Sequence, residues 1–101
     1  MDMEYFKNQI CEELDGAKDY IKLAIELKPM APAWSKVLVD MSAAELSHAT
    51  NLNKMMQEYY SKLSETYSEM PDYIKKIYDC AIDMYAEKSA KIRYMHDMFM
   101  K

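Results

Sequence analysis

Helix-breaking residues are almost absent from this chain, and their positions constrain its fold more than any other feature. One glycine and three prolines occur in 101 residues, and the prolines fall at only two places, residues 29–32 and residue 71. Glycine and proline are the residues least compatible with a helix interior. The stretches between the two breaks are rich in Ala, Glu, Lys, Leu and Met, which favours helices. The sequence therefore predicts an all-α protein with helices at about 3–28, 32–68 and 71–99.

The charge pattern and the lengths of the apolar runs exclude two classes of partner. The chain has 17 acidic and 13 basic residues, a formal net charge of −4, and no basic face suited to neutralising phosphates. We therefore expect no nucleic-acid partner. No apolar run approaches the roughly 18 residues that a membrane span requires, so we expect no membrane partner.

The N-terminus and the cysteines predict a cytoplasmic protein. The first residues are acidic and lack the basic and apolar regions of a signal peptide. Cys11 and Cys80 are isolated thiols without the spacing of a disulfide framework, a metal site or a redox motif. Free thiols are typical of a reducing compartment. The length is that of one domain, so residues 1–101 are predicted to form a single helical domain.

A short connection between the first two helices predicts how they pack. The Pro-Met-Ala-Pro link at 29–32 is so short that the second helix must run antiparallel beside the first. Two helices of this length bury little apolar surface alone, which favours association with a second chain. The third helix is expected to pack outside this pair or against a neighbouring chain.

A polar pair interrupts the apolar seam of the second helix. The seam recurs at alternating steps of four and three, the spacing of a face that packs inside a bundle. It consists of Trp34, Leu38, Met41, Glu45, His48, Leu52, Met55, Tyr59 and Leu63. Glu45 and His48 lie mid-seam on the same side of the helix. A carboxylate and an imidazole at such positions are paired, solvated or bound to a ligand, because an isolated buried charge is costly.

An acid in the first helix lies at the same height as this pair. The seam of that helix consists of Phe6, Ile10, Glu13, Ala17, Tyr20, Ala24 and Leu27. In an antiparallel hairpin, residues equally far from the turn lie side by side, and a helix rises about 1.5 Å per residue. Counting from the turn places Glu13 within one helical turn of Glu45 and His48. We hypothesise that Glu13, Glu45 and His48 bind metal.

The single glycine falls close to this candidate site. Gly16 lies in the middle of the first helix, one turn from Glu13, where glycine is less favourable than alanine. Two interpretations stay open. In the first, its lack of a side chain lets a ligand or another helix approach the backbone closely. In the second, the glycine has no role and is tolerated at the edge of the apolar seam.

The two segments that carry the candidate ligands resemble ferritin-like di-iron carboxylate proteins. Residues 13–20 (ELDGAKDY) are similar to the first ligand helix of bacterioferritin-type and rubrerythrin-type chains. That helix has a small residue three positions after the ligand and a tyrosine seven after it. Residues 44–49 (AELSHA) are similar to the second ligand helix. The resemblance implies that Glu13, Glu45 and His48 are metal ligands. Two interpretations of Tyr20 stay open: a hydrogen-bond donor or radical relay beside the ligands, or a core residue whose hydroxyl is satisfied elsewhere.

The chain departs from that family's usual pattern in having one such helix pair instead of two. No second Glu-x-x-His exists, because the other histidine, His96, follows Arg93 at that spacing. Half-size encapsulated ferritins share this arrangement and complete a four-helix bundle by homodimerisation. The resemblance thus implies a homodimer or higher homo-oligomer that shares two iron ions per dimer, with manganese as the other candidate. An encapsulin shell stays open as a partner, although no docking tail is evident after the third helix.

Three classes of function are consistent with these residues. The first is a ferroxidase that oxidises Fe(II) with O2 or peroxide, and the second is a metal-binding protein without turnover. The third is a structural or adaptor bundle whose Glu/His layer only fixes register. His96 is expected at the surface near a helix end, outside the site.

Overall fold

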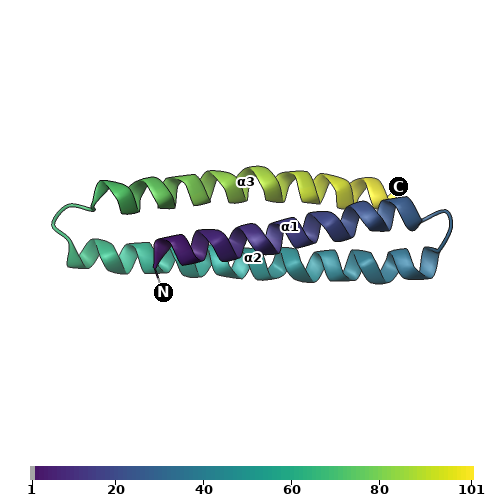
Figure 1. Ribbon diagram of the computed structural model, residues 1–101, viewed down its shortest axis with the longest axis horizontal. Coiled ribbons are helices and arrows are strands. Elements are labelled where there is room, and N and C mark those ends of the chain that lie inside the picture. Colours follow the sequence, from purple (N-terminus) through teal and green to yellow (C-terminus); the bar gives the residue numbers. More distant parts are fainter. Residues whose placement is uncertain (1) are drawn as a thin grey trace.

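Three long helices form an elongated molecule with extents of 57 × 19 × 16 Å (Figure 1). The computed structural model describes residues 2–101. The helices are α1 (Met3–Leu27), α2 (Pro32–Thr66) and α3 (Asp72–Met100), with no strand among these residues. The prediction of an all-α protein is confirmed. None of the helices over this range is long and apolar enough to span a membrane.

The helix ends follow from local residues. The Asp2 side chain accepts a hydrogen bond from the Tyr5 N–H at 2.9 Å and caps the start of α1. Pro32 opens α2, where its missing N–H costs no hydrogen bond. α2 ends two residues before the predicted boundary because Tyr67 adopts an extended backbone, with φ −101° and ψ 136°. Pro71 precedes α3, which therefore begins one residue later than predicted.

α1 is the central helix of the molecule. It packs against both of its neighbours, whereas α2 and α3 contact each other least. In Figure 1, α1 lies between the other two over most of its length. Its buried line consists of Met3, Phe6, Ile10, Leu14, Ala17, Ile21 and Ala24. The apolar core of the chain therefore lies along α1 and not between α2 and α3.

The seam predicted for α2 is wrong for the single chain. The buried line of α2 consists of Ser35, Val39, Ser42, Ala49, Asn53 and Met56, each one position after a predicted residue. Trp34, Met41 and Met55 instead expose 69%, 40% and 49% of their surface. Small side chains on this line let the α2 backbone approach α1 closely. Such side chains contribute little to an apolar pattern, so the pattern does not reveal them. Trp34, Met41, His48 and Met55 of the predicted seam therefore lie on the exposed side of the α1–α2 pair, which we call the open face, whereas its other apolar residues are half-buried against the core.

Polar contacts connect α3 to the other two helices. Ser42 Oγ donates to the carbonyl of Ala17 at 2.6 Å and lies 2.9 Å from His96 Nε2. The Ser42 hydroxyl has one proton, so His96 Nε2–H is the donor to Ser42. Lys88 Nζ lies 3.0 Å from Asp15 Oδ1 and joins α3 to α1. The expected surface position of His96 is therefore wrong: the last turns of α3 lie beside α2, and the imidazole is half-buried between them.

Burial of His96 predicts a pH dependence of folding. Burial lowers the pKa of His96 below its ordinary 6.5, and the nearby Asp97 charge opposes this shift. The unfolded chain therefore binds this proton more readily than the folded chain does. The contribution to stability is complete above about pH 6.5 and decreases as the pH falls toward the lower folded pKa.

The effect of His96 is measured by urea unfolding of the wild type and of His96→Gln at several pH values. We expect the free energy of unfolding of the wild type to decrease relative to that of the variant as the pH falls below 6.5. The comparison cancels the titration of groups that both proteins share. A difference that stays constant between pH 7.5 and pH 5 would contradict this prediction.

Candidate metal centre

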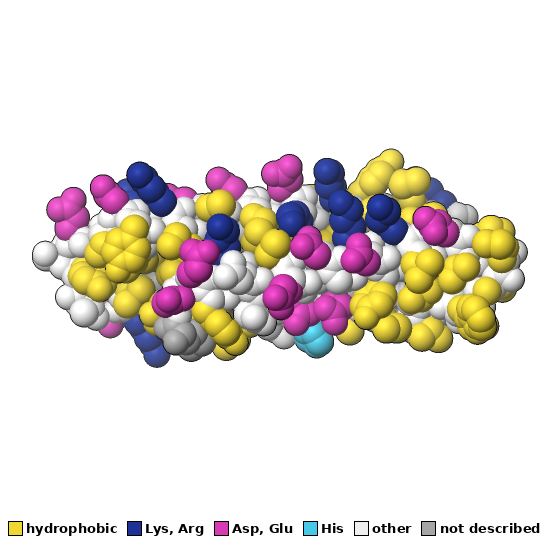
Figure 2. Space-filling view, in the orientation of Figure 1, with side chains coloured by type: hydrophobic (Ala, Val, Ile, Leu, Met, Phe, Trp, Pro, Cys, Tyr) yellow, Lys and Arg dark blue, Asp and Glu magenta, His cyan; other side chains and the backbone are white. Residues whose placement is uncertain are grey.

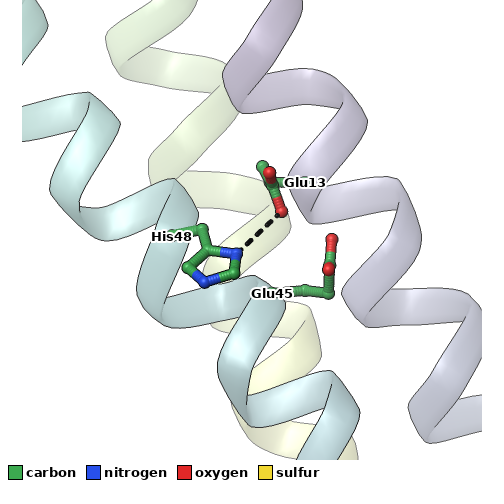
Figure 3. Close-up of side chains that lie close together, drawn as sticks. All are labelled: Glu13, Glu45 and His48. Atoms are coloured by element: carbon green, nitrogen blue, oxygen red, sulfur yellow. Dashed lines mark hydrogen bonds and ion pairs between the residues drawn. The ribbon is translucent and has the colours of Figure 1, made fainter.

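Three potential metal ligands converge at the middle of the open face. Glu13 extends from α1, and Glu45 and His48 extend from consecutive turns of α2 toward it (Figure 3). One ligand atom from each residue lies within 4.8 Å of the others. The structure thus brings together the three residues that the sequence places at one height. α3 passes behind them in Figure 3 and contributes none of the three.

The imidazole is the most exposed member of the group. His48 Nδ1 lies 3.4 Å from Glu13 Oε2, and the two side chains are 56% and 26% exposed. An exposed pair at this distance contributes little to stability, because water screens both groups and the side chains lose freedom. Stabilisation of the fold is therefore a weak explanation for the cluster. The exposure of His48 also leaves space in front of the group for a ligand or a second chain.

The Glu13 carboxylate raises the pKa of its neighbour Glu45. A hydrogen bond with Glu13 is the largest cause that raises the pKa of Glu45 above 4.5; burial and the Glu13 charge add to it, and His48 opposes it. Because the Glu13 charge repels ionised Glu45, ionisation of Glu45 destabilises the fold. A bound cation removes this repulsion. The pair is therefore better suited to holding a cation than to holding the helices together.

Glu45 reaches the group through a gap in the surface of α1. A Cβ atom placed on Gly16 would lie only 3.0 Å from Glu45 Oε2. The carboxylate therefore lies directly against the α1 backbone, where any other residue would place a side chain. Of the two interpretations of Gly16, the structure supports close approach, and the approaching group is a side chain of α2.

The other candidates named from the sequence lie outside the group. Tyr20 is half-buried on α1, and no hydrogen bond joins it to Glu13, Glu45 or His48. Its role beside the ligands stays a prediction. His96 bonds to Ser42 instead. Over residues 2–101, no further cluster of three or more His, Cys, Asp or Glu side chains has the spacing of a metal site.

The donor set fits iron or manganese. Carboxylate oxygens are hard ligands that suit Mn and Fe, and imidazole suits Fe in both oxidation states. Three ligands leave further coordination positions open to a second chain, water or an oxidant. Carboxylates also bridge metal pairs about 3.5–4 Å apart, which a single imidazole does not do. Two such groups face to face would provide four carboxylates and two imidazoles.

The comparisons with known proteins give one match. A protein-family model described as Rubrerythrin matches residues 4–98, nearly the whole chain. The match includes all three helices and all three residues of the cluster. Neither the curated proteins nor the solved structures include a match to this chain.

Proposed function

Because the chain belongs to the rubrerythrin family of ferritin-like di-iron proteins, we propose that it is a di-metal oxidase completed by a second copy of itself. In this proposal Glu13, Glu45 and His48 of two copies bind two iron ions, or two manganese ions. The activity is oxidation of Fe(II) by O2 or peroxide. The observation that carries the proposal is the convergence of these three side chains on an exposed face within a chain of this family.

The position of the cluster supports a twofold partner. Glu13 lies near the middle of α1, and His48 lies near the middle of α2. A twofold axis perpendicular to the helices and passing through the cluster would therefore overlap the α1–α2 pairs along their whole length. It would also place the two sets of ligands opposite each other. The half-size chain would then form a four-helix bundle, with α3 of each copy on the outside.

The distribution of apolar side chains on the open face supports the same arrangement. A hollow near the α1–α2 turn is lined only by Leu23, Leu27, Trp34, Val37 and Leu38. A second hollow beyond the cluster is lined in part by Phe6, Met55 and Tyr59. Figure 2 shows apolar side chains gathered toward both ends of the visible face, with charged groups between them. The twofold axis would place the first hollow of one copy over the second hollow of the other.

Each residue has a defined task in this function. The Glu13 and Glu45 carboxylates hold the cations and compensate their positive charge. His48 binds through a neutral imidazole nitrogen, and the other nitrogen is free to donate a hydrogen bond. When bound, two Fe(II) ions supply the two electrons that reduce one peroxide to two hydroxides.

The cysteines support the proposed location of the protein. Cys11 and Cys80 are both free thiols, which supports the reducing, cytoplasmic location where Fe(II) persists.

One observation also fits the alternative function, a structural bundle in which a polar layer only fixes the register of the helices. It is the Glu13–His48 pair at 3.4 Å. Metal content separates the two functions.

The first test is elemental analysis of the purified protein together with its mass in solution. We expect about one iron or manganese ion per chain and a dimer or a multiple of dimers, because each two-metal site takes its ligands from two chains. Addition of Fe(II) and air should then give a ferric absorbance band. A monomer that takes up no metal after incubation with Fe(II) would refute the proposal and favour the structural bundle.

A further inference from the structure

The backbone conformation at position 16 does not explain why the residue there is a glycine. It lies inside α1 with ordinary helical geometry, and its φ is not positive. Every other residue type except proline adopts this geometry, and alanine would stabilise the helix relative to glycine. The backbone therefore gains nothing from glycine at this position. What glycine provides here is space.

The atoms nearest to the space at Gly16 all belong to the side chain of Glu45. An added Cβ would lie 3.0 Å from Oε2, 3.6 Å from Cδ and 3.8 Å from Cγ of Glu45. All three atoms belong to the end of a flexible side chain and none to a backbone. An added methyl group would therefore move the Glu45 carboxylate and leave the helices in place.

We propose that Gly16 is a positioning residue of the metal centre, whose missing side chain lets the Glu45 carboxylate lie between α1 and α2 beside Glu13. This inference rests on the proposed function, since it assigns the gap to a metal ligand. Glu45 belongs to α2, and its carboxylate reaches Glu13 on α1 by crossing the contact between the two helices (Figure 3). A methyl group at Gly16 would displace this carboxylate by a few tenths of an ångström.

A small displacement of this carboxylate has a large effect on metal binding. Ligand distances in metal sites vary by only about 0.2 Å from their ideal values. Substitutions that disturb the orientation of a ligand typically reduce metal affinity by about 10–100-fold. Gly16→Ala should therefore weaken metal binding although position 16 has no ligand atom. The same substitution should not destabilise the metal-free fold, because alanine is the better helix former.

The test compares Mn(II) binding and thermal unfolding of the wild type and Gly16→Ala. Mn(II) is the probe because it binds carboxylate and imidazole ligands without being oxidised by air during the titration. We expect Gly16→Ala to weaken Mn(II) binding by about tenfold or more. Ser61→Ala, at an exposed position of α2 four turns from Glu45, is the control for helix propensity and should leave the affinity unchanged. A decrease smaller than tenfold in Gly16→Ala overturns the proposal.

A double-mutant cycle on the metal-free protein tests the steric basis independently. In a Glu45→Ala background the gap is empty, so Gly16→Ala should raise the Tm by about 5 °C. In the wild type, displacement of Glu45 should reduce that rise. An equal change of Tm in both backgrounds would show that Gly16 and Glu45 do not interact, and would overturn the proposal.

The outcomes also separate this inference from the function on which it rests. A wild type that takes up no Mn(II) refutes the di-metal function, and the positioning role fails with it. A wild type and a Gly16→Ala variant that bind Mn(II) equally well refute only the positioning role.

Discussion

Replacing Glu45 with alanine should abolish tight metal binding and lower the affinity for Fe(II) or Mn(II) by more than about a hundredfold, because loss of a ligand exceeds the 10–100-fold cost of disturbing one. Glu45 extends from α2 and lies against Gly16 of α1, beside Glu13. In a twofold dimer the substitution removes two of the four carboxylates. Titration with Fe(II) without oxygen, followed by elemental analysis, measures the loss.

The effect on folding should have the opposite sign. The raised pKa of Glu45 shows that the folded chain disfavours its ionised form, first because of the hydrogen bond with Glu13. Removing the carboxylate therefore should not reduce the stability of the metal-free protein at neutral pH. Loss of binding with retained stability is typical of a residue kept for function.

A neighbouring acid is the matched control for this substitution. Glu12→Ala makes the same change of charge at an exposed position next to Glu13, outside the cluster. It should leave the stoichiometry and the affinity close to those of the wild type. If Glu45→Ala also kept the wild-type stoichiometry, Glu45 would not be a ligand and the proposed site would be wrong.

The convergence of the cluster follows from few features of the sequence. The prolines at residues 29–32 mark the turn. Each helix extends from this turn by about 1.5 Å per residue, so the height of a residue follows from its distance along the sequence from the turn. A count of residues is then enough to bring Glu13 beside Glu45 and His48, and the structure brings them within 4.8 Å. The count succeeds because long helices without internal proline accumulate little positional error. What the cluster binds does not follow from position, and it stays a prediction.

Other features of the structure were not predictable from the apolar pattern. The buried line of α2 depends on Ser42 and Ala49, which carry little apolar signal, because close approach to α1 selects for small size. The half-buried position of His96 depends on the placement of α3, which residues 67–71 do not determine. The contact of Gly16 with Glu45 joins residues on two helices. Each of these features depends on contacts between two helices, whereas an apolar pattern describes the periodicity of one helix only.

Replacing Trp34 with lysine should dissociate the proposed dimer. Trp34 is 69% exposed in the single chain and lines the apolar hollow near the α1–α2 turn. An aromatic residue that becomes buried in an apolar hollow of an interface typically contributes about 2 kcal/mol, and a twofold dimer contains two copies. The dissociation constant should therefore rise roughly a thousandfold. Sedimentation over a range of protein concentrations measures it.

The matched control is Tyr94→Lys on α3. Tyr94 is 65% exposed, nearly the same as Trp34, but it lies on the helix that is expected outside the four-helix bundle. Tyr94→Lys should leave the dimer intact, and neither substitution should destabilise the monomer, because both side chains already face water. Should both variants remain dimers, the open face would not be the interface.

The Trp34→Lys substitution also tests whether metal binding depends on assembly. One chain supplies only two carboxylates and one imidazole. A monomeric Trp34→Lys variant should therefore lose tight metal binding although Trp34 lies about three helical turns from Glu45 and contacts no ligand. High protein concentration should restore dimers and metal uptake together, because mass action couples the two equilibria. A monomer that binds metal as tightly as the wild type would show instead that Glu13, Glu45 and His48 of one chain form a complete site.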